Sequence, residues 1–426
     1  VVTALGISRE KKSLGFSQQE ISGAALTEAR SNNVVNGLSG KVAGVRIGSN
    51  GGPGSGSYIQ IRGASSVSGN NEPLIVVNGV PMQQSNDKQY GGGISEINPD
   101  NIKDVSILKG PNAAALYGSR AANGVILITT KDGSSTKGLG IQYNANFTAE
   151  RPFVKPEFQN QYGGGNGYRT WYADGWSGVI QPDAYDQYSA AYGGINPGNT
   201  TATAGTDESW GAPLDGRLTR QWWTGTDVAP LSPQPNNWEE YWETGTSLTN
   251  SIALSGGNES GNFRLAYSRL DQKGISAFND YKRDNVTFGS SYNLNKWLKA
   301  TYNGDYIKTS GNRNYQDGRQ FVWAHRHISW DRLQDYASYE DVHVQRARDG
   351  RLADTDPPNW QHTFFTNPFF TNEFLPTTND KDRLLGNLTL NAKITDELSL
   401  LLRSGTDLWT DTRINVTNFE RVRNGN

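Results

Sequence analysis

The sequence of 426 residues contains no cysteine, one methionine and four histidines. Without cysteine, the chain forms no disulfide bond and holds no cysteine-ligated zinc. The scarcity of histidine and methionine also argues against a redox or metal enzyme, so we expect no enzymatic activity, no cofactor and no metal. The formal net charge is only −2 and no charged block is present, so nothing indicates a nucleic-acid partner.

Long apolar runs are absent as well. The sequence has no run of about 18 apolar residues and therefore predicts no transmembrane helix. Hydrophobic residues make up 35% of the chain, too few for a compact protein of this size with a large dry core. Glycine (49), tyrosine (19) and tryptophan (12) are abundant instead. This composition is typical of strands with one apolar face and one wet face.

Residues 1–135 differ from the rest of the chain, because all twelve tryptophans lie after residue 170. We expect a helical turn and a strand in 34–47, strands in 57–63 and 73–82, and an Asn-capped turn followed by a strand in 98–110. This first region is predicted to be a small α/β domain with a mostly buried sheet.

The stretch KGPNAAALYGSRAANGVILITTK (109–131) predicts a short helix, a glycine turn and one stiff strand. Its alanine run (113–115) allows close packing against a neighbouring surface. Gly118 is placed to reverse the chain with a positive φ. Gly124 lets the backbone approach a neighbour before the strand VILITT pairs.

Beyond residue 135 the pattern becomes an alternation with a period of two, which indicates strands with two different faces. In GIQYNANFTAE (140–150), for example, Ile141, Tyr143 and Phe147 share one face. Strands of about ten residues cross a bilayer when they are tilted. Seven such strands are expected, in the ranges 140–150, 247–256, 262–270, 284–294, 297–308, 383–394 and 398–408.

The links between these strands alternate between short and long. The short links are about GNESG, NLNK and TDE, whereas the long ones span roughly 150–246, 271–283 and 309–382. Short turns at one end and long loops at the other are typical of an outer-membrane β-barrel.

Seven strands leave two open edges, whose unpaired backbone groups lipid cannot satisfy. A barrel that holds a domain of this size needs about 22 strands. We therefore expect the remaining strands to be missing from this sequence, with strands supplied by another chain as the alternative. The polar stretch that ends at Asn426 is expected to begin an extracellular loop, and the start at Val1 is expected to be that of a processed or partial chain.

Several motifs, in order, resemble a known family. VSILKGPNAAALYGSRAANGVILITTK resembles the plug signature of TonB-dependent outer-membrane transporters, and IQIRGASS and PLIVVNGVP resemble two further plug motifs. The start, VVTALGISREKKSLGFSQQEI, is similar to the SusC/RagA-like branch found in Bacteroidetes. SWGAPLDGR and NDKDRLLGNLTLNAKITDELSL resemble barrel-region motifs of that branch. The resemblance covers essentially the whole chain. It implies an α/β plug domain in 1–135 and the N-terminal part of an antiparallel transmembrane β-barrel, with long extracellular loops, in 136–426.

The resemblance also implies a function. Such proteins import oligosaccharides, peptides or similar nutrients across the bacterial outer membrane, and a SusD-like surface lipoprotein serves as a lid. The periplasmic TonB–ExbB–ExbD system pulls on an N-terminal Ton box and remodels the plug. Val1, Val2 and Thr3 are expected to be the tail of that box and to couple the chain to TonB. The regulatory domain typical of the branch would lie upstream.

Two residues are candidates for the ligand-facing surface of the plug. Arg62 follows the predicted strand YIQI and is expected to face ligand or barrel wall. A salt bridge that holds the plug in place is the alternative for Arg62. Asn78 stands where the family usually has Asp before Gly.

Aromatic residues gather in the first long loop. Flat aromatic rings stack on sugar faces, so we expect contacts with ligand or lid. A membrane-interface girdle and ordinary loop packing are the alternatives. The candidates are Trp171, Tyr172, Trp176, Trp210, Trp222 and Trp223.

Other patterns carry less information. GGPGSGS lacks the Lys-Ser/Thr of a phosphate loop and is expected to be a flexible loop at the plug apex. HRH (325–327) would place two histidines on one face if extended, but no third metal ligand is near in sequence. DTDPPN (354–359) and TNDKD (378–382) lack the spacing of a calcium-binding hand and are expected to be solvated loops.

Two other functions stay open at this stage. A SusC-like chain can serve as a non-transport subunit of a larger outer-membrane folding or export complex. A soluble β-rich glycan-binding protein or glycosidase is the second, although the regular alternation of turns and loops argues against it.

Overall fold

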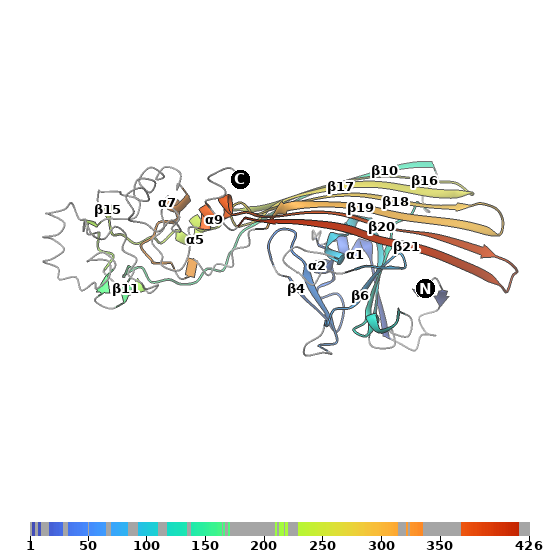
Figure 1. Cartoon of the computed structure of the whole chain (residues 1–426), viewed down its shortest axis with the longest axis horizontal. Helices are drawn as coiled ribbons and strands as arrows, with labels where there is room; N and C mark the ends of the chain where they lie inside the picture. The colour runs from blue at the N-terminus through green and yellow to red at the C-terminus, as the bar shows by residue number, and fades with distance from the viewer. Residues whose placement is uncertain are drawn as a thin grey trace.

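The computed structural model contains a small α/β domain and a long seven-stranded sheet, which we call the plug and the wall (Figure 1). The described residues are 2–4, 7–9, 17–28, 33–49, 51–64, 70–83, 93–109, 117–133, 138–163, 165–166, 169–170, 209–210, 213–216, 218–219, 229–313, 321–322, 324–334 and 368–416. Among them, no helix has the length and apolar character needed to cross a bilayer.

The plug is built on a five-stranded mixed sheet in the order β3, β8, β9, β6, β7. These strands are β3 (Ser17–Ser22), β8 (Ile102–Lys109), β9 (Val125–Thr130), β6 (Leu74–Val77) and β7 (Val80–Pro81). β6 runs parallel to β9, and the other neighbours are antiparallel. Every side chain of β6 is buried, as the apolar run LIVV predicts for a strand covered on both faces.

Short helices and hairpins complete the plug. They are β1 (Val2–Ala4), β2 (Ile7–Arg9), α1 (Gly23–Thr27), α2 (Val34–Leu38), β4 (Val45–Ser49), β5 (Ser57–Ile61), η2 (Gly93–Glu96), η3 (Pro99–Asn101) and η5 (Ser119–Ala121). Helix α2 begins after Asn33, whose side chain accepts from the backbone N–H of Val35. Leu26, Val35 and Leu38 pack into one core with residues of the sheet, and each such buried side chain contributes about 1.5–3 kcal/mol.

The predicted elements of the plug are mostly confirmed. The Asn-capped turn and strand of 98–110 appear as η3 and β8, and Gly118 has φ +73°. The range 73–82 forms a hairpin rather than one strand, because the left-handed Asn78 (φ 48°) and Gly79 (φ 86°) reverse the chain between β6 and β7. The helix expected early in 109–131 lies outside the described residues.

The wall is an antiparallel meander in sequence order. Its strands are β10 (Gly138–Glu150), β16 (Gly245–Gly257), β17 (Gly261–Lys273), β18 (Asp280–Asn293), β19 (Leu298–Asn312), β20 (Thr377–Lys393) and β21 (Ser399–Asn415). All seven predicted strands are confirmed. β10 and β21 are the two edges of this sheet.

The strands are longer than predicted, with 13 to 17 residues each. On β20 the face turned away from the plug is apolar at Leu384 and Leu388 and becomes charged at Asp382. The strand nevertheless continues to Thr377, because backbone pairing with β19 and β21 does not depend on an apolar face. The segment 378–382, expected to be a solvated loop, therefore belongs to β20.

A tyrosine marks the charged end of the apolar band on two strands. The Tyr267 hydroxyl donates to Asp284 Oδ1 at 2.6 Å, and the Tyr306 hydroxyl donates to Asp382 Oδ1. Amphipathic tyrosines of this kind are typical of a membrane–water interface. The alternation of apolar and polar residues thus gives the wall one face for lipid and one for the plug.

The three short turns at one end of the wall are built alike. Asn258, Asn295 and Thr395 each accept two backbone N–H groups of their own turn through a side-chain oxygen. At the other end, the link between β17 and β18 covers only 274–279. The expectation of a long link over 271–283 was wrong, because both strands extend into it.

Three short helices lie beyond the other end of the wall (Figure 1). They contribute to an aromatic cluster. The helices are α5 (Asn237–Tyr241), α7 (Trp330–Gln334) and α9 (Pro368–Phe374). Tyr241, Phe321 and Trp330 are buried at its centre, with ring centroids 4.7–5.5 Å apart. Short strands β11 (Gly165–Asn166), β12 (Arg169–Thr170), β13 (Ser209–Trp210), β14 (Leu218–Thr219) and β15 (Ala229–Pro230) lie in the same loops.

At two positions of the plug, close contacts with the backbone of another segment require glycine. A Cβ on Gly124 would lie 2.9 Å from the carbonyl oxygen of Leu108, which confirms the predicted close approach. A Cβ on Gly23 would lie 2.0 Å from the carbonyl oxygen of Ile102. Helix α1 can therefore sit on β8 only because residue 23 has no side chain.

Gly23→Ala is expected to lower the free energy of plug unfolding by about 3 kcal/mol, because the methyl group forces α1 away from β8. Gly48→Ala is the matched control, since a Cβ there meets nothing within 4 Å. Urea unfolding, followed through a fluorophore on a cysteine introduced at exposed Ser39, measures both. Equal midpoints for the two variants would contradict the assigned contact.

Candidate functional site

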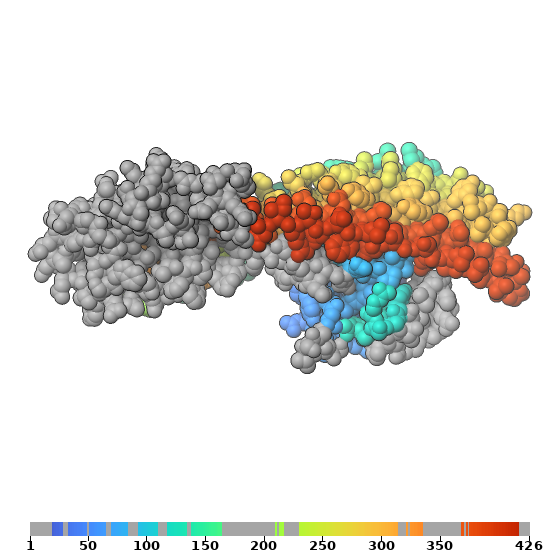
Figure 2. Space-filling model, viewed as in Figure 1, coloured from blue at the N-terminus to red at the C-terminus, as the bar shows by residue number. Residues whose placement is uncertain are grey.

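The interface between plug and wall contains most of the buried charge of the described residues, and we treat it as the candidate functional site. The plug meets the inner face of the wall below β20 and β21 (Figure 2). Segments of the plug that lie far apart in sequence contribute to it, because each reaches the wall at a loop or a short helix.

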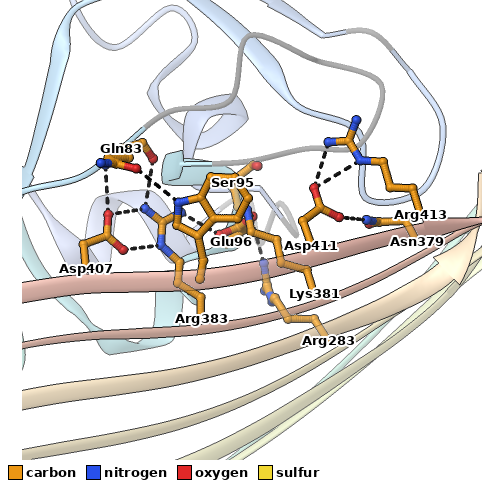
Figure 3. A network of polar contacts seen from close by, with 11 residues as sticks. Gln83, Ser95, Glu96, Arg283, Asn379, Lys381, Arg383, Asp407, Asp411 and Arg413 are labelled. Carbon is orange, nitrogen blue, oxygen red and sulfur yellow. Dashed lines mark hydrogen bonds and ion pairs between the residues drawn. The ribbon is translucent and has the colours of Figure 1, made fainter.

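The centre of the interface is Glu96, at the end of η2. Its carboxylate accepts from Lys381 Nζ and, at 2.9 Å, from Arg383 Nη1, both on β20 (Figure 3). All three residues are at most 6% exposed. Two cations around one buried carboxylate are stable only when the remaining donors are also satisfied.

Arg383 satisfies its other donors through two further partners. Its Nε and Nη2 donate to the carboxylate of Asp407 on β21, at 2.8 and 2.6 Å, and Nη2 also reaches the carbonyl oxygen of Gln83. The backbone N–H of Gln83 donates to Asp407 as well, at 2.9 Å. Arg283 on β18 completes the group by donating to the carbonyl oxygen of Ser95 (Figure 3).

A second contact forms at the tip of η3. Asn101 accepts from Arg264 Nη1 at 2.9 Å and donates to Thr287 Oγ1 at 2.8 Å. Thr287 in turn donates to the buried carboxylate of Asp305. Behind the tip, burial and the neighbouring Arg264 lower the pKa of Lys131.

The glycine loop forms a third contact. Pro53 is buried, and its carbonyl oxygen accepts from Arg313 Nη1. The Arg313 guanidinium lies 4.3 Å from the ring centre of Tyr281, and a Cβ on Gly54 would clash with both side chains. The loop was expected to be flexible, but these contacts hold its middle against the wall.

The turn between β6 and β7 forms a fourth contact. The Asn78 side chain donates to Thr130 Oγ1 at 2.9 Å and accepts from the Thr130 N–H at 3.0 Å, which closes the turn onto β9. The Asn78 carbonyl oxygen accepts from Asn387 on β20. Both polar groups of the Asn78 side chain are thus used within the plug.

Lys109 ties the first strand of the plug sheet to the rest. Its Nζ donates to Gln19 Oε1 on β3 at 3.1 Å and to the carbonyl oxygen of Ala43 at 2.7 Å. Burial, followed by the charge of Arg62, lowers the pKa of Lys109. Arg62 itself follows β5, is exposed and has φ 58°.

The remaining sequence candidates are spread over the chain. Val2 and Thr3 lie in β1, which pairs with β2. Trp210 lies in β13 and is 60% exposed. The centre of its ring is 5.9 Å from the centre of the Tyr162 ring. The candidates outside the described residues are Val1, Trp171, Tyr172, Trp176, Trp222 and Trp223.

The histidines of HRH do not form an extended pair. His325 and His327 are buried in a turn at the aromatic cluster, with ring centroids 5.6 Å apart and nearly parallel planes. In the described part of the chain, no group of three or more His, Cys, Asp or Glu residues is arranged to hold a metal ion.

Sequence reasoning missed the charged residues of the interface. Lys381 and Arg383 alternate along β20 with Asp380 and Asp382, so both faces of this strand carry charge. Alternation alone therefore does not show which face meets the plug. The one sequence feature that distinguishes the two faces is the apolar Leu384, which lies on the same face as Asp382 and therefore on the face turned away from the plug.

Glu96→Ala is expected to destabilise plug docking by about 3–5 kcal/mol, because it leaves two buried cations without their shared carboxylate. Glu239→Ala is the control, since its ion pair with Lys155 is more than half exposed and contributes less than about 1 kcal/mol. The Ser39 fluorophore reports the urea midpoint of each variant. Similar shifts in the two variants would refute the central role of Glu96.

Comparison with known proteins agrees with this architecture. The family model described as TonB-dependent Receptor Plug Domain matches residues 10–125. The TonB-dependent receptor SusC of Bacteroides thetaiotaomicron is 28% identical over 321 residues, which cover 75% of this chain and 26% of SusC. The TonB-dependent receptor P39 of Formosa agariphila is 29% identical over 69% of this chain and 23% of its own length. The chain thus spans about a quarter of the length of these relatives.

Solved structures share the fold. The RagAB peptide importer in its open-open state matches with a TM-score of 0.63 and 18% identity, over 96% of this chain and 42% of the solved chain. Its closed-closed state matches with a TM-score of 0.63 and 19% identity, over 94% and 41%. The two curated relatives are TonB-dependent receptors, and the solved structures are those of a peptide importer. The chain is therefore similar to TonB-dependent receptors of the SusC type: residues 10–125 match their plug domain, and the chain shares the fold of RagAB.

Proposed function

We propose that this chain is the plug and the first third of the barrel of an importer for oligosaccharide or peptide nutrients. Residues 1–135 form the plug and 136–426 the first part of a barrel of about 22 strands. A SusD-like lipoprotein covers the extracellular mouth, and TonB–ExbB–ExbD supplies the energy. The observation that carries this proposal is the buried interface, which fixes the body of the plug to the wall and leaves its first strand at an edge.

Because β3 lies at an edge of the plug sheet, we expect it to be the first strand that separates under force. β3 pairs only with β8 within the described sheet, from Ser17 opposite Lys109 to Ser22 opposite Asp104. A pull on the N-terminal side loads these pairs one after another, and each backbone hydrogen bond contributes only about 0.5–1.5 kcal/mol. Local opening of such a low-stability segment does not require the whole domain to unfold.

In the described part of the chain, the polar contacts with the wall named above come after β3. Pro53, Asn78, Gln83, Glu96 and Asn101 hold the rest of the plug after β3 has left. Force that enters at Val1–Gly6 is therefore expected to act first on β1, β2 and β3. This order supports a gate that opens from its N-terminal side.

Two observations bear on the class of cargo. RagAB, which shares the fold, is a peptide importer, whereas aromatic residues in the first long loop favour sugar stacking. Trp238 and Trp242 pack against the aromatic cluster, so loop packing accounts for these two residues. Trp222 and Trp223 remain the first candidates for cargo contact.

Deletion of residues 1–6 from the full-length protein is expected to abolish energised uptake and to leave ligand binding intact, because the deletion removes the expected tail of the Ton box and its link to the plug. Radiolabelled nutrient uptake and equilibrium binding to outer membranes measure the two properties. Outer-membrane abundance serves as the control for assembly. Unchanged uptake would sink the coupling role of Val1, Val2 and Thr3.

Replacement of Trp222 and Trp223 by Ala is expected to weaken cargo binding by about 5- to 100-fold, since an aromatic stacking contact contributes about 0.5–1.5 kcal/mol. Trp297→Ala is the control, because Trp297 is exposed in a short turn at the opposite end of the wall. Isothermal titration calorimetry gives both affinities. If the control weakens binding equally, the loop assignment fails.

A further inference from the structure

The inner face of the wall carries cations whose oxygen acceptors belong to the plug. They come from four adjacent parts of the wall, namely β17, β18, the residue after β19, and β20. The pairs are Arg264 with Asn101 Oδ1, Arg283 with the Ser95 carbonyl, Arg313 with the Pro53 carbonyl, Lys381 with Glu96, and Arg383 with Glu96 and the Gln83 carbonyl.

The plug neutralises few of these charges. Glu96 is the one plug carboxylate in the five pairs, and the other acceptors are carbonyl or amide oxygens. On the wall, the carboxylates of this region are Asp305, bonded to Thr287, Asp407, bonded to Arg383, and Asp411, paired with Arg413. Asp100 of the plug also acts on Arg264, without a direct hydrogen bond. The wall behind the plug therefore has more positive than negative charges.

These cations follow a stripe along the wall. Arg283 on β18 is in register with Thr309 on β19, and Thr309 is in register with Lys381 on β20. Arg283 and Lys381 thus stand at one height, two strands or about 10 Å apart. Arg313 lies four residues beyond Thr309 along the chain. Arg264 on β17 lies opposite Gly289, and Gly289 is six residues along β18 from Arg283. The stripe runs along the strands, in the direction that cargo must travel.

We propose that this stripe is a transit site for anionic cargo, exposed when the plug moves. The proposal rests on the importer function proposed above and narrows its substrate class to oligomers that bear carboxylate or sulfate groups. In the closed state the oxygens of the plug occupy the positions that cargo oxygens take in the open state. Glu96 then resembles the acidic group of the cargo.

Electrostatics favours a transit site for anionic cargo over a role limited to holding the plug against the wall. When the plug leaves, each cation loses an acceptor and faces water in a narrow lumen with low-dielectric walls. Such clefts focus the field and raise the local concentration of ions of opposite charge. An anion bound midway between Arg283 and Lys381 lies about 5 Å from each, which is within the Debye length of about 8 Å at physiological salt, so both cations attract it. Rings of Arg and Lys select anions in other pores for the same reason.

The opposite face of the same strands offers a matched control. Lys282 on β18 and Lys308 on β19 are exposed and point away from the plug. Removing this pair changes the net charge of the wall as much as removing Arg283 and Lys381. Only the inner pair lies on the proposed path.

The test uses the full-length protein in planar lipid bilayers, with urea on the periplasmic side to unfold the plug. The barrel persists, because its backbone groups remain paired in lipid. The reversal potential in a KCl gradient gives the ratio of chloride to potassium permeability. Arg283→Gln with Lys381→Gln is expected to lower this ratio at least about twofold, whereas Lys282→Gln with Lys308→Gln leaves it unchanged. An unchanged ratio in the inner variant, or an equal fall in the outer one, would overturn the proposal.

Channel block then identifies the source of the anionic groups. Oligogalacturonate is compared with a maltooligosaccharide of equal length, and a glutamate-rich peptide with its glutamine counterpart. Stronger block by either acidic probe supports the stripe and names glycan or peptide, and equal block within both pairs refutes it. No TonB is present, so failure here is separate from failure of energised uptake on deletion of residues 1–6, which tests the importer itself.

Discussion

Polar groups buried between two rigid surfaces must all find partners, and this constraint governs the arrangement of plug and wall. A buried carboxylate such as Glu96 is costly alone and is tolerated only with both Lys381 and Arg383 in place. Arg383 in turn requires Asp407, which also accepts from the backbone of Gln83. Each group is placed by the next, so the interface has one well-defined closed position.

The same constraint divides the plug into a held part and a part that can leave. The polar contacts with the wall described above run from Pro53 to Asn101, while β3 is held mainly by its six pairs with β8 and by Lys109. An interface in which hydrogen bonds predominate also suits a component that must separate and return. Water replaces a hydrogen bond at little net cost, whereas exposed apolar surface has no substitute partner.

The two faces of the wall serve different neighbours. Outward residues such as Leu384 and Leu388 match lipid, and the tyrosine–carboxylate pairs mark where that band ends. Inward residues match the closed plug and, on our proposal, the cargo that follows it. At the end of the wall opposite the short turns, the aromatic cluster around Trp330 joins loops that have no strand in common, so these loops are held by packing instead of backbone pairing.

The sequence alone determined the order of plug and wall, the number of wall strands and the glycine positions that need special backbone geometry. These features follow from local periodicity and turn chemistry, which a single segment expresses by itself. Tertiary structure alone decided the partners of the charged residues and the true strand ends. Glu96 and Arg383 are 287 positions apart, and Asp382 next to Arg383 gives the strand charge on both faces. Pairing with neighbouring strands extended β20 through a polar segment and shortened the link between β17 and β18. Local patterns did not predict this, because they describe side chains, whereas strand pairing depends on backbone hydrogen bonds.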